Sequence, residues 1–256
     1  MDEAHLLYRV GNGIGTVTIN REAQRNAITP EAIRRFHAYL DEAEQDPGVK
    51  ALLVTGAGDK AFCTGAQLSG ATTTEGRDLF ADYADLLDKL IRFPKPTVAR
   101  VKGFCLAGGM GFMLACDIVI ASDDARFGTP EVNVGLWPMM IGALIFRNVL
   151  QKKAMEMILL GERMIAQEAL DMGLITRVVP AADLDGEVKK VLSNLTSKSP
   201  IGMKIGKEAF YSMANLPLKD ALQFLSEKLK EVVGTEDAKE GITAFIEKRE
   251  PRFTGR

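Results

Sequence analysis

The sequence predicts an α/β core followed by a helical C-terminal region, and three observations lead to this prediction. Short apolar runs rich in Val, Ile and Thr alternate with amphipathic stretches up to about residue 139, a pattern typical of sheets covered by helices. The loops between them hold many of the 24 glycines. The pattern is wholly helical from about 199 to 249. We therefore divide the chain into a core, residues 1–198, and a C-terminal helical region, residues 199–256.

The chain opens with a predicted β-hairpin and helix. Residues 6–10 and 15–19 flank a glycine-rich turn, the arrangement that favours two antiparallel strands. Thr29 suits an N-cap and Pro30 the first helical position. The next apolar positions recur at helical spacing and predict one buried stripe, made of Ile33, Phe36, His37 and Leu40. Because no acid or nucleophile is near it in sequence, we interpret His37 as a packed core residue.

The elements that follow are predicted from apolar runs and their length. Buried strands are expected over residues 51–55, 97–101, 118–121 and, in a shorter form, 125–127. Helices are expected over 75–92 and 109–116, helical character prevails after about 139, and three tail helices are predicted over 200–215, 218–233 and 235–248.

Composition excludes several classes of protein. There are 32 Lys and Arg against 34 Asp and Glu, a net charge of −2, which argues against binding nucleic acid or anionic membranes by bulk charge. Three cysteines without CxxC spacing and only two histidines predict no disulfide framework, no metal site and a cytoplasmic location. No uncharged run reaches the roughly 18 residues of a membrane span, and the N-terminus resembles no signal peptide.

Glycine-rich loops supply the first candidate site. Residues 103–111 (GFCLAGGMG) follow a predicted strand and lead into a helix, whose first N–H groups have no intrahelical partner and attract negative charge. An amide near Gly108 is therefore a candidate donor to a phosphate or to a developing oxyanion. The loop lacks the lysine of a G-x-x-x-x-G-K-S/T phosphate loop. The alternative is that its glycines only permit close helix–strand packing.

Glu131 is the candidate acid or base. It lies among Pro130, Val132, Val134 and Trp137, and an apolar neighbourhood raises the pKa of a carboxyl group towards the range useful for a general base. The alternative is a glutamate at the surface of a loop, paired with an arginine.

Five segments together resemble the enoyl-CoA hydratase/isomerase (crotonase) superfamily over nearly the whole chain. They are INR…NA at 19–27, similar to the family's N-R-P…N-A-L; AFCTGAQL at 61–68, similar to A-F-x-x-G-A-D; residues 103–117, similar to its G-x-x-x-G-G-G…C-D segment; FGTPEVNVGLWP at 127–138; and FIEKR at 245–249. The resemblance implies a spiral of ββα units with a C-terminal helical trimerisation region.

The resemblance also implies a site and its ligand. By position, the backbone N–H groups of Ala66 and Gly108 form an oxyanion hole for an acyl-CoA thioester, and Glu131 is the catalytic carboxylate. Residues assigned to the substrate and its coenzyme A are Arg25, Ala27, Gln67, Leu68 and Trp137. Coenzyme A is then part of the substrate, so no separate cofactor is expected, and the expected assembly is a homotrimer or a hexamer built as a dimer of trimers.

Gly111 departs from the family's pattern. Two-carboxylate hydratases of the family carry a glutamate there, besides the one at Glu131. One base can move a proton between two carbons, whereas adding water also needs a group that holds and deprotonates the water. We therefore expect double-bond isomerisation of an enoyl-CoA, with hydration of a 2-enoyl-CoA and a non-catalytic scaffold as alternatives. A glutamate introduced at Gly111 should add hydration, provided that it fits beside Met110 and Phe112.

Three aspartates are weighed as additional acids. The helix predicted over residues 75–92 carries Asp78, Asp82 and Asp85. Their carboxylates would be able to help activate water. Their spacing equally fits a solvated helix face, which we favour.

Overall fold

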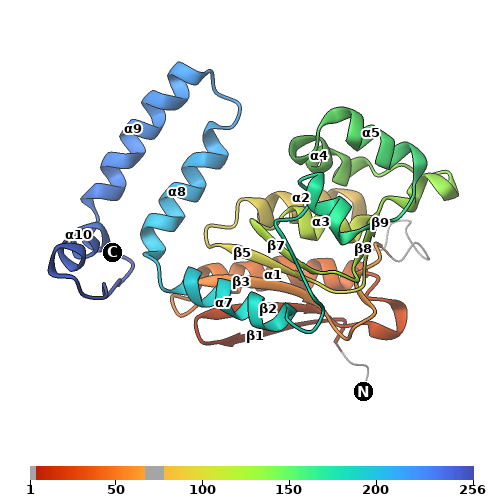
Figure 1. Ribbon diagram of the computed structural model, residues 1–256, viewed down its shortest axis with the longest axis horizontal. Coiled ribbons are helices and arrows are strands. Elements are labelled where there is room, and N and C mark those ends of the chain that lie inside the picture. Colours follow the sequence, from red (N-terminus) through yellow and green to blue (C-terminus); the bar gives the residue numbers. More distant parts are fainter. Residues whose placement is uncertain (1–3, 67–77) are drawn as a thin grey trace.

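The computed structural model describes residues 4–66 and 78–256, and its strands form two sheets (Figure 1). The larger sheet has the order β1-β2-β3-β5-β7-β10 and the smaller one β4-β6-β8-β9. The strands are β1 Leu6–Gly11, β2 Ile14–Ile19, β3 Ala51–Gly56, β4 Ala61–Cys63, β5 Thr97–Val101, β6 Phe104–Leu106, β7 Ile118–Ser122, β8 Arg126–Gly128, β9 Met164–Ile165 and β10 Arg177–Val179.

Helices follow the strands and fill the second half of the chain. They are α1 Pro30–Gln45, α2 Leu79–Ile91, α3 Gly108–Leu114, α4 Met139–Asn148, α5 Gln151–Leu160, α6 Ala166–Asp171, α7 Leu184–Thr196, α8 Pro200–Met213, α9 Leu218–Gly234 and α10 Glu236–Glu247, with short 3-10 turns η1 Glu22–Gln24 and η2 Pro130–Val134. Among the described residues, none of the helices combines the length and apolar character needed to cross a membrane.

Three ββα units follow one another and organise the core. They are β3-β4-α2, β5-β6-α3 and β7-β8-α4, and in each the first strand joins the larger sheet and the second strand the smaller one. Consecutive units pair in parallel in both sheets. This repeat confirms the predicted spiral of ββα units. It also makes the second strands of the three units, β4, β6 and β8, neighbours in the smaller sheet.

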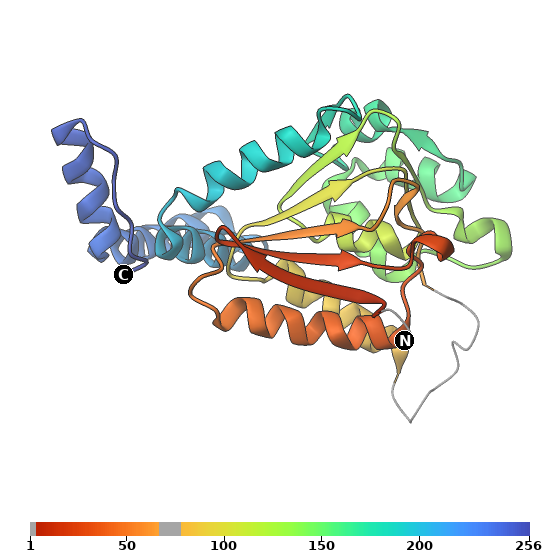
Figure 2. The same cartoon turned by 90° about the horizontal axis from the view of Figure 1, so that it is seen from below.

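The larger sheet is buried on both faces, as its apolar strands predict. Helix α7 lies against one face (Figure 2), where Leu184, Val188 and Leu192 pack with Val98 and Ile120. Helix α1 lies on the opposite side of the sheet, and its buried stripe belongs to the main core. Burial on both faces makes the sheet a rigid support for the loops that leave its strands.

The hairpin and first helix form as the sequence predicts. Strands β1 and β2 are antiparallel, and the turn between them uses left-handed φ angles of 53° at Asn12 and 79° at Gly13. The Thr29 hydroxyl accepts a hydrogen bond from the N–H of Ala32, which caps α1. His37 contacts the backbone carbonyl of Asp82 through Nε2 at 3.1 Å, so it ties α1 to α2, in keeping with a packing role.

Four short strands differ from what the sequence indicates. Strands β4 and β6 lie inside the glycine-rich segments that were expected to be loops, and β9 and β10 lie in the region expected to be helical. Each has two or three residues and forms by pairing with a strand distant in sequence, as β10 does with β7. Such short runs carry no local periodicity, which explains why the sequence alone did not reveal them.

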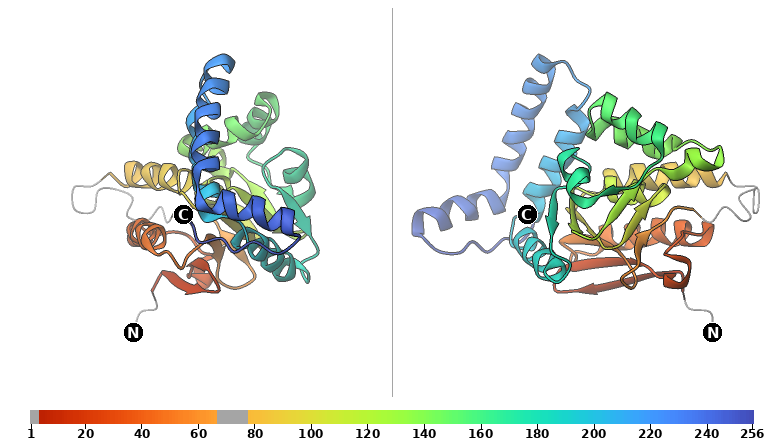
Figure 3. Two further views of the ribbon diagram at one scale, coloured as in Figure 1. Left: turned by 90° about the vertical axis from the view of Figure 1, so that its left-hand side faces the viewer. Right: turned by 45° about the vertical axis from the view of Figure 1, so that its right-hand side comes forward.

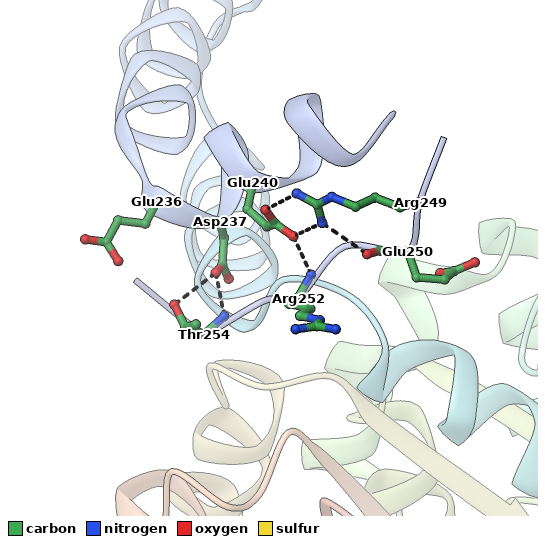
Figure 4. Close-up of a pocket in the computed structure, with 7 residues that line it drawn as sticks. All are labelled: Glu236, Asp237, Glu240, Arg249, Glu250, Arg252 and Thr254. Carbon is green, nitrogen blue, oxygen red and sulfur yellow. Dashed lines mark hydrogen bonds and ion pairs between the residues drawn. The ribbon is translucent and has the colours of Figure 1, made fainter. Parts of the chain in front are cut away.

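The C-terminal helices α8, α9 and α10 project away from the core (Figures 1 and 3). Asp237 of α10 is 1% exposed and fastens the end of the chain: its carboxylate accepts hydrogen bonds from the Ser199 hydroxyl at 2.7 Å and the Thr254 and Gly255 N–H groups at 2.7 and 3.1 Å. Around it lies a hollow of about 710 Å³ whose charged residues pair with one another, as Glu240 does with Arg249 (Figure 4). We interpret the paired residues that line this hollow as the contacts that hold the C-terminal segment against α10.

We predict that Asp237→Ala loosens this tail. The substitution leaves a hydroxyl and backbone N–H groups without their acceptor, which costs about 1–3 kcal/mol for each buried group left unpaired. Limited proteolysis should then cleave the C-terminal region, residues 199–256, faster than in the wild type. Asp220→Ala, at an exposed position of α9, should not change the cleavage rate. Equal rates for both variants would contradict the fastening role. The division into residues 1–198 and 199–256 stays a prediction that the same digestion checks.

Candidate active site

Three glycine-containing segments, residues 61–66 (the first loop), 103–111 (the second loop) and 127–132 (the third loop), run past the carboxyl ends of three neighbouring strands. In the smaller sheet β4, β6 and β8 are adjacent and parallel. The chain after β4 leads to Gly65 and Ala66, the chain after β6 to Gly108, and the chain after β8 to Glu131. Because parallel strands end at the same edge, the candidate residues meet there, at the edge where α/β sheets commonly bind ligands.

Direct contacts hold the loops together. The N–H of Ala107 donates to the carbonyl of Gly128 at 3.0 Å, which joins the second loop to the third. A Cβ on Gly65 would lie 2.9 Å from the Cβ of Ala107, so the first two loops touch. Ala107 itself has φ 51° and ψ −136°, a conformation unfavourable for a residue with a side chain. Backbone strain of this kind persists only where the surrounding structure holds the residue in place, and it clusters at active sites and ligand-binding sites.

The glycines of the second loop separate into two kinds. A Cβ on Gly109 would lie 2.1 Å from the carbonyl oxygen of Cys63, so Gly109 is required for packing of α3 on β4. A Cβ on Gly108 would meet nothing closer than 3.4 Å. Among the described residues, no backbone hydrogen bond at a turn, loop or cap uses the N–H of Ala66 or Gly108 as donor. The packing explanation therefore covers Gly109 and leaves Gly108 free for another role.

Glu131 has the environment of an acid or base. It lies in η2, and its Oε2 atom is buried without a hydrogen-bond partner among the described residues. Burial raises the pKa of this carboxyl above its ordinary range, against a smaller lowering by its own backbone N–H. Among the described residues, no arginine or lysine forms an ion pair with its carboxylate. A half-buried carboxyl group whose buried oxygen makes no hydrogen bond to the described residues is suited to receive a proton.

Gly111 faces a side chain that the sequence did not single out for the site. A Cβ on Gly111 would lie 2.1 Å from the Tyr83 hydroxyl oxygen and 2.8 Å from Cγ2 of Ile141. The condition set for gaining hydration, that a glutamate fits at position 111, is therefore not met while Tyr83 and Ile141 keep these positions. Tyr83 lies on the buried face of α2 together with Leu86, Leu87 and Leu90. Its hydroxyl, the one polar group on that face, is the feature by which the sequence distinguishes it from its apolar neighbours.

Asn26 organises the loop that carries the proposed coenzyme A contacts. Its buried side chain donates to the carbonyls of Ala57 and Ala61, at 2.9 and 2.6 Å. The neighbouring Arg25 is exposed, and its guanidinium lies 5.7 Å from the centre of the Phe104 ring. The Ala27 carbonyl accepts from Arg21. Ile28 bridges to Ala66, so this loop borders the candidate site.

The remaining predicted residues lie around this edge or outside the description. Trp137 is 43% exposed, in the segment that joins η2 to α4. Gln67 and Leu68 lie outside the described residues. Asp78 caps α2 by accepting from the N–H groups of Phe80 and Ala81. Asp85 is exposed, on a different side of α2 from Tyr83. Asp85 therefore agrees with the interpretation as a solvated helix face, whereas Asp78 caps the helix and Asp82 is half-buried, with its backbone carbonyl in contact with His37.

Comparisons with known proteins agree with this architecture. Residues 9–256 match the family described as enoyl-CoA hydratase/isomerase. A short-chain-enoyl-CoA hydratase of Clostridium acetobutylicum is 36% identical over 240 residues, 92% of each chain, and a probable enoyl-CoA hydratase of Mycobacterium tuberculosis is 36% identical over 245 residues, 95% of each.

Solved structures give the same result. The crystal structure of human enoyl Coenzyme A hydratase domain-containing protein 3 superposes with a TM-score of 0.93 at 30% identity and covers 98% of this chain and 100% of that one. An enoyl-CoA hydratase of Mycobacterium smegmatis gives 0.93 at 32% identity, with 98% and 99% covered. The chain therefore belongs to the enoyl-CoA hydratase/isomerase family.

Proposed function

We propose that this protein binds an acyl-CoA thioester and shifts the double bond of an enoyl-CoA, with Glu131 as the acid and base. The observation that supports the proposal most directly is the buried Oε2 atom of Glu131, which has no hydrogen-bond partner among residues 4–66 and 78–256. A carboxylate whose pKa is raised by burial accepts and returns a proton near neutral pH.

The proposed oxyanion hole stabilises the enolate. The N–H groups of Ala66 and Gly108 donate to the thioester oxygen, where negative charge develops when a proton leaves the neighbouring carbon. Each donor of this kind contributes roughly 2.7–4 kcal/mol to stabilisation of the transition state. The contact between Gly65 and the second loop supports the proposal, since it brings the two donors to one place.

Isomerisation and hydration differ in what they require. Isomerisation removes a proton at one carbon and returns it at another, which Glu131 alone performs. Hydration also requires a group that holds and deprotonates water. The filled space at Gly111 favours isomerisation, whereas the relatives named enoyl-CoA hydratase favour hydration as the second candidate. A non-catalytic scaffold would have no use for a carboxyl group whose buried oxygen makes no hydrogen bond to the described part of the chain.

Product analysis tests the proposal. The protein is incubated with 2-enoyl-CoA and 3-enoyl-CoA thioesters of graded chain length, and the products are separated. We expect 3-enoyl-CoA to become 2-enoyl-CoA with little 3-hydroxyacyl-CoA. Rapid accumulation of 3-hydroxyacyl-CoA would identify a hydratase, and binding without turnover of any thioester would identify the scaffold.

Coenzyme A contacts are proposed for Arg25, Ala27, Gln67, Leu68 and Trp137. Arg25 supports this because its exposed charge suits a phosphate group. Trp137 offers exposed apolar surface close to Glu131 in sequence. We propose a cytoplasmic location, supported by three free and buried cysteines, although relatives named mitochondrial include the human one.

We also propose a homotrimer or a hexamer formed through the C-terminal helices. Large apolar side chains of α8, α9 and α10 are exposed in the single chain, among them Phe210, Leu222, Leu229, Phe245 and Ile246, and the helices project from the core (Figure 3). Exposed apolar surface on this scale marks an interaction site.

Light scattering should report about three or six times the chain mass of 27.9 kDa. Phe245→Lys should lower that mass, because Phe245 is 85% exposed in the chain and a lysine would bury a charge at the interface. Val10→Lys, on the edge strand β1, serves as the control and should leave the mass unchanged. A stable 27.9 kDa species in the wild type would contradict the assembly.

A further inference from the structure

Tyr83 joins α2 to the beginning of α3. Its side chain is buried, with the residue 7% exposed, and its hydroxyl donates a hydrogen bond to the carbonyl of Gly108 at 2.5 Å. Its ring meets Phe112 edge to face, with ring centres 5.4 Å apart. Two residues of the second loop and its helix therefore fix the position of this phenol.

The same hydroxyl occupies the side-chain space of position 111. A Cβ on Gly111 would lie 2.1 Å from the Tyr83 oxygen, a distance that requires one of the two groups to move. A Cβ on Gly108 would lie 3.4 Å from it. The Tyr83 oxygen thus lies close to both Gly108, the proposed oxyanion donor, and Gly111. While Tyr83 keeps this position, a side chain at residue 111 has no room for its Cβ atom.

The chemistry of the phenol is restricted by its surroundings. Burial raises the pKa of Tyr83 well above its ordinary value, and the negative charge of the nearby Glu131 carboxylate raises it further. The phenol is therefore neutral at physiological pH, and its proton is committed to Gly108. Its free lone pairs accept hydrogen bonds, but it takes no proton from water.

We infer that Tyr83 sets the reaction specificity of this site: its hydroxyl anchors the Gly108 carbonyl and takes the space in which a second catalytic side chain would begin. The inference rests on the proposed role of Glu131. Tyr83 acts through Gly108 and Gly111, so it is a positioning residue. The contacts of Tyr83 with Gly108 and Gly111 explain why position 111 carries no second base beside Glu131.

The two reactions differ in what Tyr83 allows. In isomerisation of a 3-enoyl-CoA, Glu131 takes a proton from C2, the double bond moves from C3–C4 to C2–C3, and the proton returns to C4. No water is consumed. In hydration of a 2-enoyl-CoA, water supplies OH to C3 and a proton reaches C2, so the attacking water must lose a proton. A neutral phenol that already donates its proton does not serve that step.

The decisive experiment compares product ratios. The variants are Tyr83→Phe, Gly111→Glu and the double variant Tyr83→Ala/Gly111→Glu, each assayed with 2-enoyl-CoA and 3-enoyl-CoA. We expect the double variant to raise the ratio of 3-hydroxyacyl to isomerised product at least tenfold, since the closest remaining atom, the Cγ2 methyl of Ile141 at 2.8 Å from the new Cβ, need then shift only by a few tenths of an ångström. Gly111→Glu alone should not raise the ratio, because the Tyr83 hydroxyl lies 2.1 Å from that Cβ. A folded double variant with the wild-type ratio overturns the inference, as does equal hydration by Gly111→Glu alone.

Tyr83→Phe tests the anchoring part of the inference independently of the double variant. Loss of the anchor should lower kcat about tenfold, as expected when one hydrogen bond that positions a donor is removed, with KM and the product ratio little changed. Tyr8→Phe is the matched control, since Tyr8 is a stacked tyrosine whose buried hydroxyl has no partner among the described residues. A wild-type kcat in Tyr83→Phe overturns the anchoring role.

Failure of the proposed function has a different signature. If the wild type isomerises no 3-enoyl-CoA, the proposed function fails before Tyr83 is considered. If the wild type isomerises through Glu131 and the double variant keeps its product ratio, only the inference about Tyr83 fails. Gly186→Glu, placed in open space on α7, controls for the added negative charge and should leave the ratio unchanged.

Discussion

Glu131→Gln should lower kcat for double-bond migration by about 10²–10⁴-fold or more, the range typical of general acid–base catalysis. Glutamine keeps the size of the side chain and its hydrogen-bonding capacity but accepts no proton. Affinity for the acyl-CoA should change little, because binding is proposed to depend on the oxyanion hole and the coenzyme A contacts. Turnover assays and calorimetry with the same thioester measure the two quantities.

The pH dependence gives an independent check. Because burial raises the pKa of Glu131, kcat/KM should rise with pH through that raised pKa and then level off, since only the ionised carboxylate removes a proton. Asp85→Asn, at an exposed position on α2, is the control and should keep the wild-type profile. Rapid turnover by Glu131→Gln, with an unchanged profile, would refute the assignment of Glu131 as the base.

Stability should move in the opposite direction from activity. A carboxyl with a raised pKa binds its proton more tightly in the folded state, so the free energy of unfolding falls as pH rises from the unfolded pKa through the folded one. Glu131→Gln removes this cost. Near pH 8 its midpoint in denaturant should equal or exceed that of the wild type, and the difference should shrink on acidification.

Gly108→Val should abolish most turnover while the protein stays folded. Space exists for the Cβ, whose nearest neighbour would be the Tyr83 hydroxyl at 3.4 Å, but the branched methyl groups would extend to where the thioester oxygen must approach the Gly108 N–H. Loss of one oxyanion donor costs roughly 10²–10³-fold in kcat. Steady-state kinetics, with circular dichroism to verify folding, measure the effect.

A valine elsewhere separates this effect from a general effect of substituting a helical glycine. Gly186 lies in α7, and a Cβ added to it would have no atom within 4 Å. Gly186→Val should retain nearly full turnover. If a folded Gly108→Val variant turned over as fast as the wild type, Gly108 would be a packing glycine like Gly109.

Much of the fold could be predicted because its signals are local. The hairpin follows from a turn whose Asn12 and Gly13 adopt left-handed angles readily. Helix α1 follows from the Thr29 cap and one apolar stripe. The resemblance of five segments to a known family indicated the ββα spiral and named Glu131 and Gly108 before any contact was known.

The contacts that define the site were not predictable from local pattern. Strands β4 and β6 are three residues long and exist only because they pair side by side. The unpartnered oxygen of Glu131 depends on what surrounds it in space. Asn26 stood in a motif, but the carbonyls that its side chain holds belong to residues far along the chain.

The order of the elements, the caps and turns at their ends, and a carboxylate and a glycine in register with a known family can all be recognised in the amino-acid sequence. The contacts of Tyr83, which fills the side-chain space of Gly111 and donates to the Gly108 carbonyl, become visible only in the folded chain. They arise because α2 packs on α3 from the next unit of the spiral, and the distances between atoms that this packing sets are not encoded in any periodicity of the chain.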